Sequence, residues 1–94
     1  MEQEVIALQV IFLKEGETAI VYNPALDLSG YGNSLEDAKA DFHNAVRIFL
    51  DECKEHGTLH DAFTSFGWKQ INAHWQPQIE VLSGSSVEEF QVTT

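Results

Sequence analysis

Residues 34–57 constrain the fold more than any other stretch, because their pattern predicts a long amphipathic helix. Apolar residues recur there at intervals of three and four, so at about 100° per residue they share one face, and charged residues occupy the opposite face. Ser34 and Asp37 have the spacing of a helix cap, and Gly57 provides a left-handed residue at the far end. The apolar face consists of Leu35, Ala38, Phe42, Ala45, Val46, Phe49, Leu50 and Cys53.

Strands are predicted before this helix. The run 5–13 is apolar except for Gln9 and rich in β-branched residues, which is typical of a strand buried on both faces. A glycine-containing turn then leads into a second strand over 18–22, and the pair forms a hairpin. Asn23-Pro24 ends the second strand, residues 26–28 are expected to form a short third strand, and the glycines of 29–33 are interpreted as turn formers.

The sequence after Gly57 predicts a second, short amphipathic helix that ends at Gly67. Thr58 and Asp61 repeat the spacing of a helix cap at its start. Further along, composition indicates strands separated by a polar turn. The expected strands are 71–75, 79–82 and 90–93, and the expected turn is 83–86.

These elements predict an α+β fold in one domain of residues 1–94. We expect a small, mainly antiparallel sheet in the order β-β-β-α-α-β with an extra C-terminal strand, and the long helix packed on one face. Residues 1–67 would form the core and 68–94 a strand extension. The other sheet face would remain open, and Trp68 and Trp75 are the candidates to cover it or to form an oligomer contact, with a homodimer favoured.

The charge excludes one class of partner and favours another. Fifteen Asp and Glu against five Lys and Arg give a net charge of −10, which repels phosphate and makes backbone binding to nucleic acid unfavourable. A basic protein partner fits this surface, and a merely solvated acidic surface is the alternative. Cys53 is the single cysteine, so the chain has no internal disulfide, and the acidic start and short apolar run 5–13 predict a cytoplasmic protein without a membrane segment.

Catalytic and metal-binding chemistry is not indicated. The predicted strands lack the clustered carboxylates of a two-metal nuclease site, so we expect no enzyme and no cofactor. Cys53, His56 and His60 have a metal-like spacing, but Gly57 breaks the helix between the histidines and Cys53 faces the core. We therefore expect no metal site either.

Residues 21–38 resemble the HicB family of antitoxins. The resemblance lies in a hairpin that leads into a turn containing Pro24, a glycine-bearing loop, and the helix start Ser34-x-Glu36-Asp37-Ala38. Residues 58–69 are also similar to a segment that follows the long helix in some HicB-like proteins. Many members carry a C-terminal DNA-binding domain for which this chain has no length, so direct DNA binding is not expected.

The resemblance implies a partial ribonuclease H fold and an antitoxin that masks a small basic toxin, HicA-like, which cleaves messenger RNA. The acidic charge of this chain agrees with such a partner, because complementary fields steer association. The alternative is an orphan HicB-like domain that forms oligomers or binds a ligand and has no toxin. The candidate partner-binding residues lie on the outer face of the long helix and are Asp41, Ile48, Asp51, Glu52 and Glu55.

Overall fold

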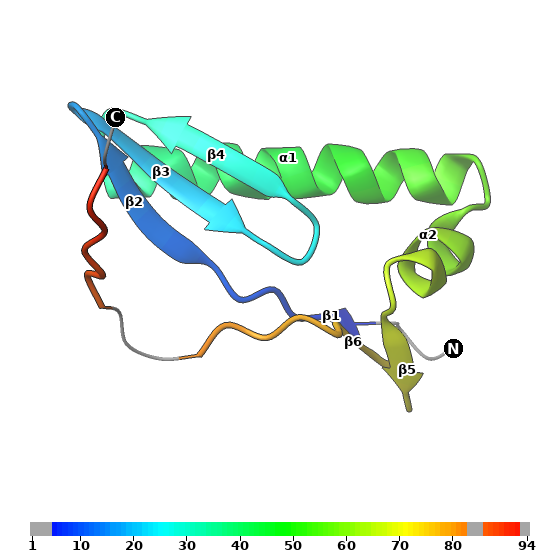
Figure 1. Cartoon of the computed structure of the whole chain (residues 1–94). Coiled ribbons are helices and arrows are strands. Elements are labelled where there is room, and N and C mark those ends of the chain that lie inside the picture. The colour runs from blue at the N-terminus through cyan, green and yellow to red at the C-terminus, as the bar shows by residue number, and fades with distance from the viewer. Residues whose placement is uncertain (1–4, 83–85, 93–94) are drawn as a thin grey trace.

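The computed structural model describes residues 5–82 and 86–92 and has an α+β fold (Figure 1). A three-stranded antiparallel sheet lies on one long helix, and a short helix and a second small sheet lie beside the C-terminal half of that helix. The elements in chain order are β1 (Val5–Ile6), β2 (Ile11–Glu15), β3 (Thr18–Asn23), β4 (Leu28–Gly32), α1 (Leu35–Glu55), α2 (Leu59–Ser65), β5 (Lys69–Ile71) and β6 (His74–Gln76).

Helix α1 confirms the prediction made from its periodicity and caps. The Ser34 hydroxyl oxygen accepts a hydrogen bond from the Asp37 backbone N–H at 3.1 Å, and Gly57 takes a left-handed φ of 65° just after the helix. Ala38 and Phe42 are buried against Val21 of the sheet, and these three side chains form the centre of the first hydrophobic cluster. The predicted packing of the long helix on one sheet face is therefore confirmed.

The glycines before α1 are strand residues, so their interpretation as turn formers was wrong. Strand β4 runs through both Gly30 and Gly32, where we expected a loop after a strand over 26–28. A Cβ on Gly30 would collide with the backbone nitrogen of Phe42 and the carbonyl oxygen of Ala38, and one on Gly32 would lie 2.6 Å from the Ala38 nitrogen. Glycine inside a strand often marks such a close backbone approach. Here it lets α1 press directly onto β4.

The run 5–13 is divided between two sheets, contrary to the expected single buried strand. β1 pairs in parallel with β6, β2 pairs with β3, and residues 7–10 between them have no regular structure. All side chains of β2 are exposed, because α1 lies under β3 and β4 and leaves β2 uncovered. An apolar run interrupted only by Gln9 does not reveal where the chain leaves one sheet for another.

A second hydrophobic cluster holds both tryptophans. Trp68 and Trp75 are only 4% and 5% exposed, and their rings lie 5.1 Å from that of Phe63, the first stacked and the second edge to face. The small sheet consists of the β5–β6 hairpin and β1. The hairpin turns at Asn72, within the expected strand 71–75. The prediction that the two tryptophans form an oligomer contact is therefore wrong for these rings, because they are buried within one chain.

Helix α2 lies where the second helix was predicted, but its capping differs. Thr58 makes no side-chain cap hydrogen bond, and its hydroxyl instead donates to the carbonyl oxygen of Cys53 at 3.4 Å. Phe63 is the buried residue of this helix, whereas Phe66 beyond its end remains 51% exposed. The predicted capping by Thr58 and Asp61 was wrong because the turn after Gly57 holds Thr58 outside an N-cap conformation.

Beyond β6 the chain runs back past β1 toward β2 without forming the expected strands (Figure 1). Residues 79–82 are anchored by one side chain: the Gln9 amide donates to the Val81 carbonyl at 3.2 Å and accepts from its N–H at 2.8 Å. A side-chain amide thus takes the place of a neighbouring strand. Residues 90–92 are not a strand either, while Thr93 and most of the expected turn 83–86 fall outside the described residues.

Candidate functional site

The five residues predicted to bind a partner all lie exposed on α1. We call them the acidic row: Asp41, Ile48, Asp51, Glu52 and Glu55. Ile48 is 53% exposed and lies within this row, among the carboxylates. Asp51 and Glu55 are one helical turn apart, and like charges at that spacing destabilise a helix by about 0.2–0.5 kcal/mol. The row therefore carries a mild repulsion that a cationic partner would relieve.

Two members of the acidic row also make contacts within the chain. A carboxylate oxygen of Asp41 accepts a hydrogen bond from the Tyr31 backbone N–H at 2.8 Å, which satisfies part of the outer edge of β4. Asp51 lies 3.9 Å from the guanidinium of Arg47, and both side chains are more than 60% exposed. Such a surface pair contributes about 0–1 kcal/mol. Ile48, Glu52 and Glu55 are therefore the best placed of the five for an external contact.

A row of basic residues, which the sequence analysis missed, lies on another side of α1. Lys39, His43 and Arg47 follow one another at four-residue intervals and therefore lie one above the other. They form one wall of an open groove of about 590 Å³, and we call these three residues the basic wall. Among the described residues no carboxylate lines this groove. The four-residue spacing of these three residues was visible in the sequence. The apolar lining consists of Ile6, Leu8, Val10, Phe12, Val21, Phe42, Val46 and Leu50.

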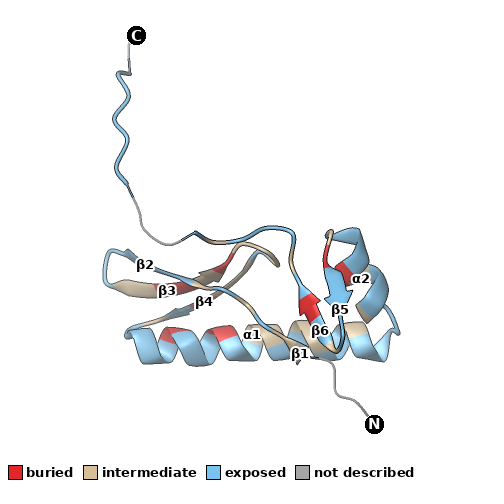
Figure 2. Cartoon of the chain, turned by 90° about the horizontal axis from the view of Figure 1, so that it is seen from below, coloured by how far each residue is buried: buried red, intermediate tan, exposed pale blue. Residues whose placement is uncertain are grey.

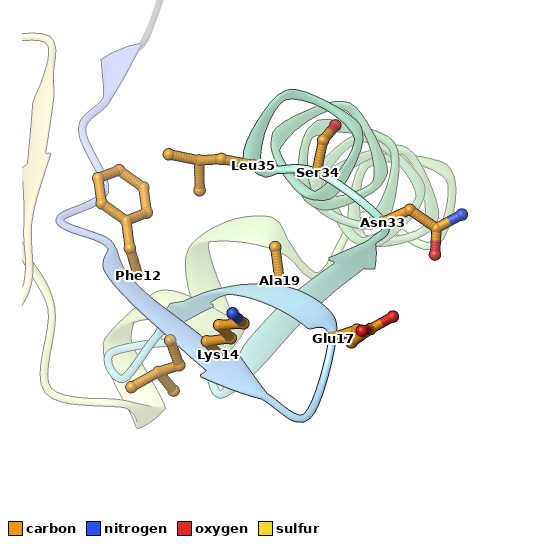
Figure 3. Close-up of a pocket in the computed structure, with 8 residues that line it drawn as sticks. Phe12, Lys14, Glu17, Ala19, Asn33, Ser34 and Leu35 are labelled. Carbon is orange, nitrogen blue, oxygen red and sulfur yellow. The ribbon is translucent and has the colours of Figure 1, made fainter.

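The groove continues beside β2 toward the start of α1. There a second cleft of about 690 Å³ lies between the β2–β3 hairpin and Leu35, with Phe12 on one side and Ala19 on its floor (Figure 3). Phe12 lines both cavities, and the Lys39 amino group lies 5.2 Å above its ring. We call the two cavities together the β2 groove. It follows the strand that α1 leaves uncovered.

No part of the described chain assembles a metal centre, since its residues contain no group of three His, Cys, Asp or Glu side chains suited to hold an ion. Cys53 is half-buried on α1, and the His60 ring packs edge to face on Trp75 with centroids 5.2 Å apart. His60 therefore supports the second cluster. The three residues with metal-like spacing do not come together as ligands.

Tyr22 and Asp27 form a small polar pair at the end of β3. The Tyr22 hydroxyl donates to a carboxylate oxygen of Asp27 at 2.9 Å, and this hydrogen bond raises the pKa of Tyr22 above its usual value of 10.0. Asp27 has a left-handed φ of 54°, which aspartate tolerates better than most residues. The pair closes the turn between β3 and β4.

Comparisons with protein-family models, with curated proteins and with solved structures gave no match to this chain. In the part of the chain that the structure describes, no helix combines the length and apolar character needed to cross a bilayer.

Proposed function

We propose that this chain is a non-enzymatic, cytoplasmic antitoxin that neutralises a small basic, RNA-cleaving protein by covering its RNA-binding surface. The observation that carries the proposal is the acidic row, in which carboxylates lie beside the exposed Ile48 on α1. A protein that binds RNA presents cations to phosphate groups. A helix that presents carboxylates competes for the same cations.

The apolar side chain of Ile48 can add binding energy that the charges of the acidic row alone do not supply. Exposed carboxylates steer a basic partner and raise the rate of encounter, but each contributes little to affinity while it remains hydrated. Binding energy concentrates in residues that become fully desolvated near the centre of an interface. Ile48, at 53% exposure among the carboxylates, is the residue of this row suited to that role.

The architecture is compatible with the family resemblance found in the sequence. The resemblance leads us to expect three strands, a helix and a returning strand. The three-stranded sheet on one long helix is present, whereas the strands after α2 pair with β1 in a second sheet. The net charge of −10 supports a basic partner and disfavours direct DNA binding. Fold likeness alone does not carry function, so the proposal depends on the acidic row.

The test is affinity capture from a lysate of the source organism, followed by an RNA-cleavage assay on any small basic protein recovered. We expect the wild-type chain to capture such a protein and to inhibit its cleavage of RNA in a stoichiometric complex. The double variant Glu52→Lys, Glu55→Lys should weaken binding at least about tenfold, since it turns two attractive contacts into repulsive ones. Lysine near the end of α1 is compatible with the helix dipole, so the helix should stay intact.

The matched control carries the same charge change elsewhere. Glu15→Lys, Glu80→Lys alters two exposed carboxylates that lie outside α1 and do not line the β2 groove. If both double variants weaken binding equally, net charge and not the acidic row is responsible. If the captured protein cleaves RNA equally well with and without this chain, the proposal is wrong.

A second candidate function is an orphan domain that forms oligomers or binds a ligand without a toxin. The observation in its favour is the β2 groove, which is open and in large part apolar, with Lys39 and Arg47 along one wall. Capture of only the chain itself at both low and moderate salt would favour this alternative. Recovery of a basic ribonuclease that the chain inhibits would exclude it.

A further inference from the structure

The C-terminal tail, residues 86–92, exposes apolar side chains to a degree that calls for a partner. Val87, Phe90 and Val92 are 90%, 85% and 93% exposed. The radius of gyration is 16.2 Å, compared with about 12 Å for a compact chain of this length. The tail leaves the body and adds no buried surface to it (Figure 2). An extended apolar segment of this kind gains free energy only when another surface covers it.

The β2 groove is a surface that a segment of this kind could cover. β2 pairs with β3 on one side, and within the described residues no strand pairs with its other edge. Phe12 and Leu13 remain 52% and 48% exposed on this strand. An exposed strand edge is a template for an added strand, and many peptides bind proteins in this way.

We propose that the β2 groove of one copy binds the C-terminal tail of a second copy, which adds a strand to the free edge of β2. The lengths match. The groove extends along α1 from Leu35 to Leu50, about 22 Å at about 1.5 Å per residue, and an extended seven-residue tail spans about 23 Å.

The chemistry of the tail complements that of the groove. Successive side chains of a strand point to opposite faces, so Glu88, Phe90 and Val92 share one side of an extended tail. The Ser86 hydroxyl already donates to a Glu88 carboxylate oxygen at 3.1 Å, which places residues 86 and 88 on the same side. On this side of the tail, the Glu88 carboxylate would face the basic wall, and Phe90 and Val92 would face the apolar lining of the groove. Within a chain of net charge −10, the cations Lys39 and Arg47 give the acidic tail a favourable site.

The position of the tail favours a second copy over its own groove. In Figure 2 the tail leaves on the side of the sheet away from α1, whereas the groove is bounded by α1. Binding in the same chain would require the tail to reverse and pass to the opposite side of the sheet. Exchange between two copies allows each tail to reach the groove of the other and closes the assembly as a symmetric dimer.

The first test is sedimentation equilibrium of the full chain and of two matched variants. Glu88→Lys and Glu89→Lys make the same charge change at adjacent residues that lie on opposite sides of an extended tail. We expect the wild type to dimerise, Glu88→Lys to raise the dimer dissociation constant at least about tenfold, and Glu89→Lys to change it less than about threefold. Equal effects of the two variants would overturn the proposed register, and a wild type that stays monomeric at millimolar concentration would overturn the proposal.

A mixing experiment separates exchange between copies from binding within one chain. Lys39→Glu, Arg47→Glu destroys the basic wall and keeps an intact tail, whereas Phe90→Ser removes the apolar anchor of the tail and keeps an intact groove. Each variant should be monomeric alone, and their mixture should form a heterodimer held by one intact contact. If mixing restores no dimer, the tail does not exchange. Unchanged tryptophan fluorescence shows that each variant is folded, because both tryptophans lie in the second cluster, which shares no residue with the tail.

Discussion

The two hydrophobic clusters of this chain contact the same long helix, but they are built in opposite ways. The first cluster is formed by Val21, Ala38 and Phe42. It depends on the absence of a side chain at Gly30, which lets the backbone of α1 approach β4. The second depends on large rings, with Phe63 between Trp68 and Trp75. The first cluster should therefore be broken by adding atoms and the second by removing them.

The largest expected effect is the removal of the ring at the centre of the second cluster. Phe63 is 1% exposed and contacts both tryptophan rings, so Phe63→Ala should lower the free energy of unfolding by about 3–5 kcal/mol. Urea denaturation followed by tryptophan fluorescence measures this directly. Phe66→Ala is the matched control, because Phe66 is 51% exposed and its loss should change stability by less than about 1 kcal/mol. Similar losses in both would contradict the assignment of the core.

Adding one methyl group to the first cluster should have the next largest effect. In Gly30→Ala the new Cβ meets backbone atoms of α1, which cannot rotate away as a side chain does, so we expect a loss of about 2–3 kcal/mol. Gly16→Ala is the control. Gly16 has a left-handed φ of 61° but open space around it, so the cost is backbone strain alone, about 1 kcal/mol. Thermal unfolding of the two variants distinguishes steric contact from backbone strain. A greater loss of stability in Gly16→Ala than in Gly30→Ala would refute the close approach of α1 to β4.

A buried polar residue joins the two regions, and its loss should have an intermediate effect. The Asn23 amide donates to the Gln9 carbonyl at 2.7 Å, and its oxygen accepts from the Leu26 N–H at 2.8 Å. Asn23→Ala leaves both backbone groups without these partners, which costs about 1–3 kcal/mol. Hydrogen exchange should then rise in residues 7–10, the link between the two sheets. Asn33→Ala, at an exposed position, should leave that exchange unchanged.

The smallest effect concerns the turn that follows β3. The pKa of Tyr22 is raised because its neutral hydroxyl donates to Asp27, so this bond is present below the usual tyrosine pKa and is lost as pH rises through the raised value. In a Tyr31→Phe background Tyr22 is the only tyrosine, and its ionisation can be followed by ultraviolet absorbance. Asp27→Asn should lower the pKa of Tyr22. An unchanged titration would mean that the hydrogen bond is absent in solution.

The sequence predicted the features that depend on local spacing. The span of α1, the Ser34 cap and the end at Gly57 follow from residues a few positions apart, and the structure confirms each. The same local rules misread Gly30 and Gly32, since a glycine in a turn and a glycine beneath a helix look alike until the helix is placed. They also misread Trp68 and Trp75, because composition does not say whether an aromatic side chain is buried within its own chain.

Of the two candidate sites, the acidic row follows from local sequence spacing, whereas the β2 groove depends on the tertiary arrangement. The exposed positions of Asp41, Ile48, Asp51, Glu52 and Glu55 were predictable from the periodicity of α1. The β2 groove was not predictable, because it exists only where α1 leaves one strand of the sheet uncovered. The spacing of Lys39, His43 and Arg47 indicates a shared helix side, but it does not show that a groove lies beside them.

Both proposals use α1, which would bind a basic protein through the acidic row and a second copy of the chain through the basic wall. The most direct test is native mass spectrometry of the chain mixed with the captured basic protein. We predict that Glu52→Lys, Glu55→Lys keeps the dimer and loses the basic protein, and that Lys39→Glu, Arg47→Glu keeps the basic protein and loses the dimer. Loss of both properties in either variant, or of neither in both, would contradict the separation of the two surfaces.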